Sequence, residues 1–412
     1  MSQPPPPEAA DPGRFHAWTA AALVAVGLNL RPALTSLAPV LAEIRAETGL
    51  TVTAAGILTT LPVLCLGLFG PLAPRFARRL GPETTVLLFL NLLALGLLLR
   101  GFGRPGLFLG TVLAGAGIGV VGVLLPGLIK RDFPRAPGPM MGLYTMVLCA
   151  GAAAGAGLTV PAEGWLGSGW AGALMAWSLP VFAAAAIWAP LARGRREGAV
   201  PHRSSMAALL RDPLAWAVTG YMGLQSSLAY IAFGWLPVIL RERGLDAAGA
   251  GWASAGSIIT QVVTALVVPV LAARARDQRP HITIVLVLAV AGFWLVALGP
   301  LALLPLGAAV LGLGLGGTFA SALTLIVLRA PDAPSAADLS GLAQSVGYAV
   351  AAAGPFLVGA ARDASGGWTA PVLVYTAIAG GALLMSLRAG RAGHVLRPTM
   401  PASLPTPAEE RP

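Results

Sequence analysis

Residues 17–41 read AWTAAALVAVGLNLRPALTSLAPVL and carry one formal charge, Arg31. The stretch from Trp18 to Leu30 is 13 residues long, and as an α-helix it would cover only about 20 Å. The hydrocarbon core of a bilayer is about 30 Å thick. A helix that crosses it must therefore continue past Arg31 to about Leu41. The segment predicts a transmembrane helix with an arginine inside it.

The rest of the chain is as apolar as this segment. Hydrophobic residues make up 56% and charged residues 11% of the 412 positions, and the mean hydropathy is +0.77. A soluble domain carries roughly 25% charged residues, so the composition excludes a soluble protein and requires lipid around the chain. Apolar runs long enough to cross a bilayer predict twelve spans, at 17–41, 52–73, 84–101, 106–129, 139–161, 170–192, 214–240, 248–273, 281–299, 303–328, 339–361 and 369–388.

The basic residues are distributed unevenly between the two sides of these spans. With the N-terminus in the cytoplasm, 20 of the 27 lysine and arginine residues fall on the cytoplasmic side and six on the outer side, with Arg31 between them. Positive residues collect in cytoplasmic loops. The bias predicts a multi-pass protein of the cytoplasmic (inner) membrane with both termini inside. The net charge of +10 then reflects topology, and we expect no nucleic-acid partner.

An internal repeat appears at an offset of 198 residues. The shift superimposes matching residues of several span pairs, among them Pro39 and Pro237, Pro71 and Pro269, Arg131 and Arg329, and Trp170 and Trp368. Six spans per repeat give both halves the same orientation, so the repeats are parallel. We predict an all-α integral membrane fold of twelve transmembrane helices in two parallel six-helix repeats, with helices 1, 4, 7 and 10 lining a central cavity. The predicted parts are a disordered tail at 1–15, bundles at 16–192 and 214–388, a cytoplasmic linker at 193–213 and a disordered tail at 389–412.

Arg31 is the candidate binding residue. A buried arginine costs several kcal/mol unless something compensates its charge, and no aspartate or glutamate falls within the core of any predicted span. The partner is an anionic substrate, a set of backbone carbonyls freed near Pro32, or the outer membrane interface, if Arg31 reaches it. The first of these interpretations predicts a small anionic solute.

Other polar side chains within the spans are further candidates for substrate binding. Tyr221 and Gln225 share one stripe of span 7, Tyr230 flanks the repeat equivalent of Arg31, and Gln344 and Tyr348 share one face of span 11. The alternative for each is a hydrogen bond between helices, worth under about 2 kcal/mol. Asn29 lies about 200° around the helix from Arg31, which favours a tie between helices, although we keep it among the candidates.

The sequence offers little for catalysis. Cys65 and Cys149 fall inside apolar runs, the four histidines lie near helix ends or in loops, and no HExxH, CxxC or Walker-type motif occurs. We therefore expect no enzyme, no metal and no cofactor. A membrane sensor would add a soluble output domain, which we do not find in the sequence. A multidrug exporter with an apolar pocket stays open as the alternative to a solute permease, and the direction of transport is not readable.

Several motifs carry a family resemblance. Residues 29–36 read NLRPALTS and are followed by EIR at 43–45, TGL at 48–50, LPV at 61–63, GPLAP at 70–74, LLP at 124–126, KRDFP at 130–134 and GWLP at 234–237. Together they resemble the cyanate/2-nitroimidazole permease group of the major facilitator superfamily. This resemblance implies a secondary transporter of a small, anionic, cyanate-like solute, or a nitroimidazole-type exporter, working as a monomer by alternating access.

The loop between spans 2 and 3 departs from the superfamily pattern. Residues 70–81 are similar to the superfamily's gating loop, whose acidic residue would fall at Pro74. The resemblance implies a gating role for Arg75, Arg78 and Arg79. The departure at Pro74 leaves these three arginines without the usual partner.

Overall fold

The computed structural model describes residues 12–194 and 206–395, and every regular element in these ranges is helical. Twelve helices are long and apolar enough to cross a membrane. In the first half the elements are α1 (Pro12–Leu30), α2 (Pro32–Thr35), η1 (Ala38–Val40) and α3 (Leu41–Thr48) in span 1; α4 (Val52–Phe69), η2 (Gly70–Leu72) and α5 (Ala73–Leu80) in span 2; α6 (Pro82–Leu99), α7 (Gly103–Asp132) and α8 (Pro137–Leu166) as spans 3 to 5; and α9 (Gly169–Ala176) with α10 (Ser178–Gly194) in span 6.

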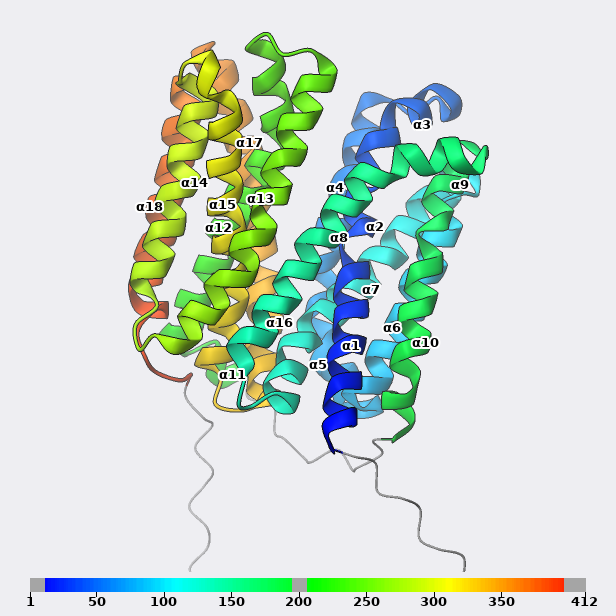
Figure 1. The fold of residues 1–412 in the computed structure, drawn as a ribbon, viewed down its shortest axis with the longest axis vertical. Helices are drawn as coiled ribbons and strands as arrows, with labels where there is room; N and C mark the ends of the chain where they lie inside the picture. The colour runs from blue at the N-terminus through cyan, green and yellow to red at the C-terminus, as the bar shows by residue number, and fades with distance from the viewer. Residues whose placement is uncertain (1–11, 195–205, 396–412) are drawn as a thin grey trace, which may run out of the picture.

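The second half repeats this order after the short helix α11 (Met206–Leu209). Its elements are α12 (Pro213–Glu242), α13 (Ala247–Arg274) and α14 (Arg279–Leu298) as spans 7 to 9; η3 (Leu301–Leu303) and α15 (Leu304–Arg329) in span 10; α16 (Ala333–Ala351) and α17 (Ala353–Ser365) in span 11; and α18 (Thr369–Ala389) as span 12. The two halves form two bundles that stand side by side, and the chain enters the first and leaves the second at the same end (Figure 1). We call this end the terminal side. The predicted fold of twelve helices is confirmed.

Several spans begin at an aspartate that caps the helix. The carboxylates of Asp212, Asp246 and Asp332 accept hydrogen bonds from the backbone N–H groups of Leu214, Gly249 and Ser335 at 2.7, 2.7 and 2.9 Å. Asp212 and Asp332 stand one and two residues before a proline. An N-cap carboxylate satisfies a free amide of the first turn, and proline at N1 needs no partner. These caps fix the starts of spans 7, 8 and 11 in the second half.

Matching tryptophans anchor the two halves on the side opposite the termini. Trp170 donates from Nε1 to Glu47 Oε2 at 2.7 Å, and Trp368 donates from Nε1 to Glu242 Oε2 at 2.8 Å. The offset of 198 pairs these two tryptophans. In each bundle the bond joins the start of the sixth span to the end of the first, so the internal repeat extends to tertiary contacts.

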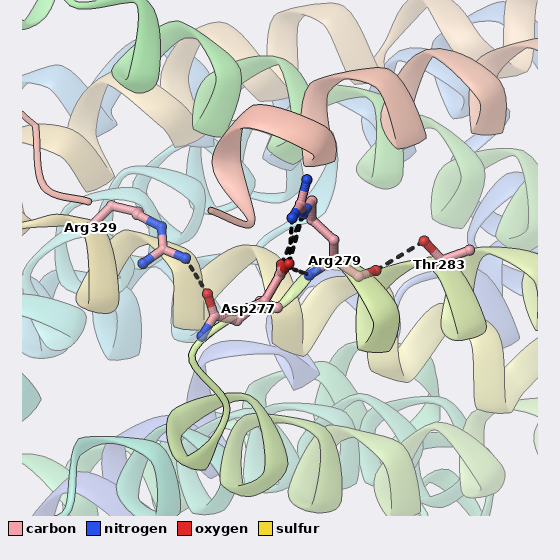
Figure 2. A network of polar contacts seen from close by, with 5 residues as sticks. Asp277, Arg279, Thr283 and Arg329 are labelled. Carbon is pink, nitrogen blue, oxygen red and sulfur yellow. Dashed lines mark hydrogen bonds and ion pairs between the residues drawn. The ribbon is translucent and has the colours of Figure 1, made fainter. Parts of the chain in front are cut away.

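Matching arginines hold the terminal side. Arg131 at the end of span 4 pairs with Glu83 at the start of span 3, at 2.6 Å. Its repeat equivalent Arg329, at the end of span 10, donates to Gln278 before span 9 (Figure 2) and from Nε to the Ala389 carbonyl at 2.7 Å. Each arginine ties the end of one helix to the start of the preceding one.

A second pair stands next to this network in Figure 2. Arg279 forms a two-pronged ion pair with Asp277, with the shortest contact at 2.5 Å, and its carbonyl accepts from Thr283 Oγ1 at 2.9 Å. Hydrogen bonds from Arg279 lower the pKa of Asp277 to about 2. The ordinary value is about 3.9, so this carboxylate stays charged throughout the physiological pH range.

The bundles meet mainly near the terminal side. Lys130 Nζ donates to the Val327 carbonyl at 2.8 Å, where spans 4 and 10 end. Thr145 Oγ1 donates to the Ala265 carbonyl at 2.6 Å and joins span 5 to span 8. Toward the opposite side, α3 and the start of α4 stand apart from α13 and α17 (Figure 1). The contacts close one end of the space between the bundles.

The ends of the chain differ from the predicted disordered tails. Residues 12–15 already belong to α1, and residues 390–395 pack onto the second bundle. The Val395 N–H donates to the Arg329 carbonyl at 2.8 Å, Gln278 N–H donates to the Gly390 carbonyl at 3.0 Å, and Val395 is buried. These backbone bonds and the buried valine hold the segment. The rest of the two predicted tails and residues 195–205 of the predicted linker lie outside the described residues.

Candidate functional site

A cavity of about 290 Å³ lies between the two bundles. Its size is close to the lower end of small-molecule sites. Within the described part of the chain, Arg31 is the one residue with a formal charge in its lining, and no carboxylate faces it. The other lining residues are Leu34, Thr35 and Ala38 in span 1, Thr59 and Val63 in span 2, Leu148, Cys149, Ala152 and Ala156 in span 5, Gln225, Ser226, Ala229, Tyr230 and Phe233 in span 7, Ile258 and Gln261 in span 8, Leu315 and Phe319 in span 10, and Tyr348 in span 11.

Span 1 breaks where it presents Arg31. The helix α1 ends at Leu30, Arg31 caps α2, and Pro32 is the first residue of α2. The break differs from the continuous helix expected at 17–41. Its cause is Pro32, which has no N–H to donate and whose ring crowds the preceding turn. The backbone carbonyl of Arg31 accepts from the N–H groups of Leu34 and Thr35 at 2.9 and 3.2 Å.

Glycines of span 5 allow close packing against this break. A Cβ atom on Gly151 would lie 2.1 Å from the Leu28 carbonyl oxygen, and one on Gly155 would lie 2.7 Å from the Pro32 Cα. Side chains at either position would push the two helices apart. Thr35 Oγ1 donates to the Ala152 carbonyl at 2.9 Å and fixes the register of the contact. Backbone packing therefore holds the arginine in place.

The guanidinium of Arg31 has no hydrogen-bond acceptor among the described residues. Arg31 is half-buried, and its Cζ atom lies 4.6 Å from the centre of the Phe319 ring, which belongs to the other bundle. A cation over an aromatic face is stabilised by about 0.5–2 kcal/mol, which does not offset the several kcal/mol of a buried cation. The N–H donors of Arg31 are free to bind a solute in the cavity.

Arg100 binds a backbone carbonyl near Pro32, which is the structural role that the sequence analysis considered for Arg31. Its side chain is fully buried, Nη1 donates to the Ala33 carbonyl at 2.8 Å, and Nε donates to Thr111 Oγ1 at 3.1 Å. The arginine that binds a carbonyl beside Pro32 is thus Arg100. Arg100 is one of the six basic residues that the charge count placed on the outer side, because it stands at the very end of predicted span 3 and nothing in the sequence separates it from a loop arginine.

Three of the other predicted site residues line the cavity together with Arg31. Gln225, Tyr230 and Tyr348 all face it. The Gln225 amide donates from Nε2 to the Met222 carbonyl at 3.2 Å and to Ser226 Oγ at 2.8 Å. The rings of Tyr230 and Tyr348 lie 6.4 Å apart with their planes tilted by 60°.

The remaining three predicted residues bond elsewhere. Asn29 Nδ2 donates to the Ala25 carbonyl one turn back, at 2.8 Å. Tyr221 OH donates to the Thr318 carbonyl at 3.3 Å, which ties span 7 to span 10. Gln344 Nε2 donates to the Gly122 carbonyl at 3.2 Å, which ties span 11 to span 4 of the other bundle. None of the three belongs to the cavity lining.

The expectation that spans 1, 4, 7 and 10 would line the cavity is wrong for span 4. No residue of α7 is part of the lining, whereas spans 2, 5, 8 and 11 contribute. Span 11 lies against α7 and bonds to it through Gln344. Because the bundles have closed on the terminal side, this contact covers the face of span 4 that was expected to be open.

Gln261 in span 8 is a lining residue that the sequence analysis missed. It is 7% exposed, and its Nε2 has no hydrogen-bond partner among the described residues. Thr260 and Thr264, on either side of it, donate to the carbonyls of Ala309 and Leu313 at 3.0 and 2.8 Å. The sequence TQVVT at 260–264 does not distinguish the glutamine from the two threonines. The carbonyl partners across the helix interface do, because only the threonines have them.

The predicted gating arginines lie on α5 at the terminal side. Arg78 Nη1 is 4.0 Å from Asp338 Oδ1 on α16 of the other bundle, Arg75 donates to the Pro71 carbonyl of its own segment at 3.3 Å, and Arg79 is exposed. The carboxylate near Arg78 thus comes from span 11, since position 74 is a proline. Asp338 was placed just outside that span. The structure starts the helix at Ala333, so Asp338 lies inside it, near its start and outside the cavity lining.

Comparison with known proteins finds relatives that are named as transporters. The chain is 39% identical over 367 residues to the "Uncharacterized transporter YycB" of Bacillus subtilis (strain 168), covering 87% of this chain and 90% of the relative. It is 37% identical over 360 residues to the 2-nitroimidazole transporter of Escherichia coli (strain K12), covering 86% and 90%, and 31% identical over 377 residues to the cyanate transport protein CynX of the same organism, covering 89% and 95%.

The fold has solved counterparts as well. The structure of the proton:xylose symporter XylE matches with a TM-score of 0.73 at 12% identity, covering 92% of this chain and 95% of that one. At this identity the match concerns the fold alone. The family model of the Major Facilitator Superfamily matches residues 18–355. Two of the relatives, the 2-nitroimidazole transporter and the cyanate transport protein, carry the names of the permease group that the sequence motifs resemble. The chain belongs to the Major Facilitator Superfamily and is a multi-pass membrane transporter, not an enzyme.

Proposed function

We propose that the protein moves a small anionic solute across the cytoplasmic membrane by alternating access. The observation that carries this proposal is the guanidinium of Arg31, a cation that lines the cavity and has no acceptor among the described residues. An anion in the cavity would supply the missing charge. The planar fork of an arginine also fits a carboxylate or another flat group with two acceptor atoms.

The lack of acidic residues supports the same choice. A cationic solute would be repelled by Arg31, and the cavity lining has no carboxylate in the described part of the chain to compensate. The name of one relative, a cyanate transport protein, fits an anionic solute. The other named solute, 2-nitroimidazole, carries a nitro group with two partly negative oxygens, which an arginine fork can also bind.

A second candidate function is the export of a flat, uncharged compound of the nitroimidazole type. The aromatic rings around Arg31 favour it, because Tyr230, Phe233, Phe319 and Tyr348 all line the cavity. Rings stack on rings or meet them edge to face at centroid distances of 4.5–7 Å. The two candidates differ in whether the solute must carry a charge.

The placement of contacts supports alternating access. The two repeats meet near the terminal side, and their cavity lies between them. With both termini in the cytoplasm, as the charge bias predicts, the described conformation is closed toward the cytoplasm. Rocking of one bundle against the other would open the cavity toward the cytoplasm and close it on the outer side. We propose that one chain suffices, because both repeats needed for the cavity belong to it.

A thermal-shift screen on the purified full chain tests the proposal. Cyanate, formate, nitrate and benzoate are compared with benzamide and 2-nitroimidazole. We expect the anions to raise the melting temperature of the wild type and to have no effect on Arg31→Ala. If 2-nitroimidazole alone stabilises the protein and the anions do not, the proposal is wrong and the exporter is favoured.

A further inference from the structure

Two glutamine amides in the cavity wall have buried atoms without partners. Gln225 is fully buried and its Oε1 has no hydrogen bond among the described residues. Gln261 is 7% exposed and its Nε2 has none. Both side chains line the cavity, and their helices α12 and α13 contact each other. One amide thus offers a free acceptor and its neighbour offers a free donor.

The orientation of the Gln225 amide is fixed by its neighbours. Its Nε2 points at the Met222 carbonyl, which can only accept, so Oε1 is the atom left without a partner. In Gln261 the unpaired atom is Nε2, which has no hydrogen-bond partner among the described residues. Leaving a buried polar group unpaired costs about 1–3 kcal/mol. A hydrophobic residue would avoid that cost. The first bundle has one at the repeat equivalent of Gln261, where Val63 lines the cavity.

These amides line the same cavity as Arg31. Arg31 belongs to the first bundle, and both glutamines belong to the second. The repeat equivalent of Arg31 is Ala229, which is one helical turn, about 6 Å, from Gln225. A solute held at both places would bridge the two bundles.

We propose that Gln225 and Gln261 form a second polar anchor, which binds a group of the solute that both donates and accepts a hydrogen bond. The proposal rests on the proposed function, since Arg31 takes the two-oxygen end of the same solute. Its substrate class is a flat ring that carries a carboxylate or nitro group and, elsewhere on the ring, an N–H or O–H group next to an acceptor. A three-atom anion has no donor for Gln225 Oε1.

The aromatic walls of the cavity suit a ring. Tyr230 lies 6.4 Å from Tyr348 and 6.4 Å from Phe233, measured between ring centres. The centre of the Phe319 ring lies 4.6 Å from the Arg31 guanidinium carbon. The cavity volume of about 290 Å³ far exceeds the roughly 30 Å³ that one water occupies in the liquid. A three-atom anion alone would leave most of it unfilled.

Calorimetric titration of the full chain in nanodiscs tests the proposal with a matched pair of solutes. Imidazole-4-carboxylate has a ring N–H and a ring acceptor, whereas thiophene-2-carboxylate has the same charge and a similar flat ring without either. We expect the wild type to bind the imidazole about tenfold more tightly, the effect of one to two hydrogen bonds. Gln225→Leu and Gln261→Leu should each reduce this preference several-fold and leave the affinity for the thiophene unchanged.

Stability separates binding from a structural role. Gln261→Leu removes an unpaired polar group, so we expect its melting temperature to stay the same or rise. Gln225→Leu also removes the hydrogen bonds from Nε2 to the Met222 carbonyl and Ser226 Oγ, so we expect a small decrease in its melting temperature. Val63→Leu is the control, since it alters the wall at the equivalent position and should change the affinity for both solutes equally. Equal affinity of the wild type for the two solutes would overturn the proposal, as would a glutamine variant that weakens both alike.

Cyanate provides the remaining arm of the experiment. If cyanate binds tightly through Arg31 and neither ring compound binds, the anionic function stands and the second anchor is refuted. If none of the three anions binds, the proposed function is wrong, and the proposal of a second anchor, which depends on it, is wrong as well.

Discussion

The guanidinium of Arg31 lies against the ring of Phe319, 4.6 Å from its centre, and the two residues come from different bundles. The charge that we propose to bind solute is therefore held at the boundary that must change during transport. The contact is worth only about 0.5–2 kcal/mol. It positions the cation and leaves its N–H donors available.

Replacement of Arg31 tests the binding role against the structural one. Arg31→Ala should lower the affinity for a bound anion about 100-fold, because two hydrogen bonds to a charged group are lost. Arg31→Lys should recover little, since an ammonium cannot form the two-pronged pair. The melting temperature of both variants should not fall. Titration and thermal unfolding on the same samples check this, and normal affinity in a destabilised Arg31→Ala protein would contradict it.

Arg100 should show the opposite pattern. Arg100→Leu leaves the buried Ala33 carbonyl without its donor, so we expect a loss of about 1–3 kcal/mol in the free energy of unfolding. Affinity for the solute should change little in the protein that folds. Denaturant unfolding monitored by tryptophan fluorescence measures the first effect. An unchanged unfolding free energy with lost binding would move Arg100 from the scaffold to the site.

The contrast between these arginines shows how far the sequence could be interpreted. The length of the segment before Arg31 placed it inside a span, and the repeat offset gave the architecture, because proline, arginine and tryptophan recur at fixed positions. The sequence could not place Arg100, since its partner Ala33 is 67 residues away. Gln261 was missed for a similar reason. Only packing against span 10 reveals that Thr260 and Thr264 are paired while the glutamine between them is not.

The ion pair between Arg78 and Asp338 should bias the conformation. The two groups are 4.0 Å apart across the bundles, and the Arg78 side chain is 42% exposed, so solvent screening limits the pair to under about 1 kcal/mol. Asp338→Asn should therefore shift the population several-fold at most toward the state open on the terminal side. The rate at which Cys149, which lines the cavity, reacts with a thiol reagent from the opposite side should fall accordingly.

Two variants control that measurement. Arg79→Gln removes an exposed charge from the same helix and should leave the labelling rate of Cys149 unchanged. The exchanged pair Arg78→Asp with Asp338→Arg should restore the rate of the wild type. If Arg79→Gln acts like Asp338→Asn, the effect comes from the charge of the loop in general and the specific pair has no role.

Topology can be checked by cysteine labelling in intact cells. In a background without Cys65 and Cys149, single cysteines placed at 194–210 should react only with reagents that cross the membrane, because the charge bias predicts that this segment is cytoplasmic. Leu301→Cys lies in the exposed turn on the opposite side and should react with an impermeant reagent. Labelling of the 194–210 cysteines by that reagent would reverse the orientation.

The last prediction concerns the mode of transport. To change sides without solute, the protein must enclose Arg31 without a counter-charge, and removing an unpaired charge from water costs several kcal/mol. A difference of about 3 kcal/mol slows a step about 100-fold. A bound anion removes this cost. We therefore expect exchange of anions to be about 100-fold faster than net uptake, measured in proteoliposomes that are preloaded with the solute or empty.

A carboxylate placed opposite Arg31 should weaken that coupling. Ala229 lines the cavity at the repeat equivalent of Arg31. Ala229→Asp supplies an internal counter-charge, so it should raise the rate of net uptake relative to exchange and lower the affinity for the anion. Ala229→Asn matches the size without the charge and should keep the ratio of the wild type.

Equal rates into loaded and empty vesicles for the wild type would show that the empty protein changes sides freely. Uptake that follows an imposed pH gradient and stops in Glu43→Gln would instead indicate proton coupling, through a carboxylate that the structure places on the exposed surface of α3.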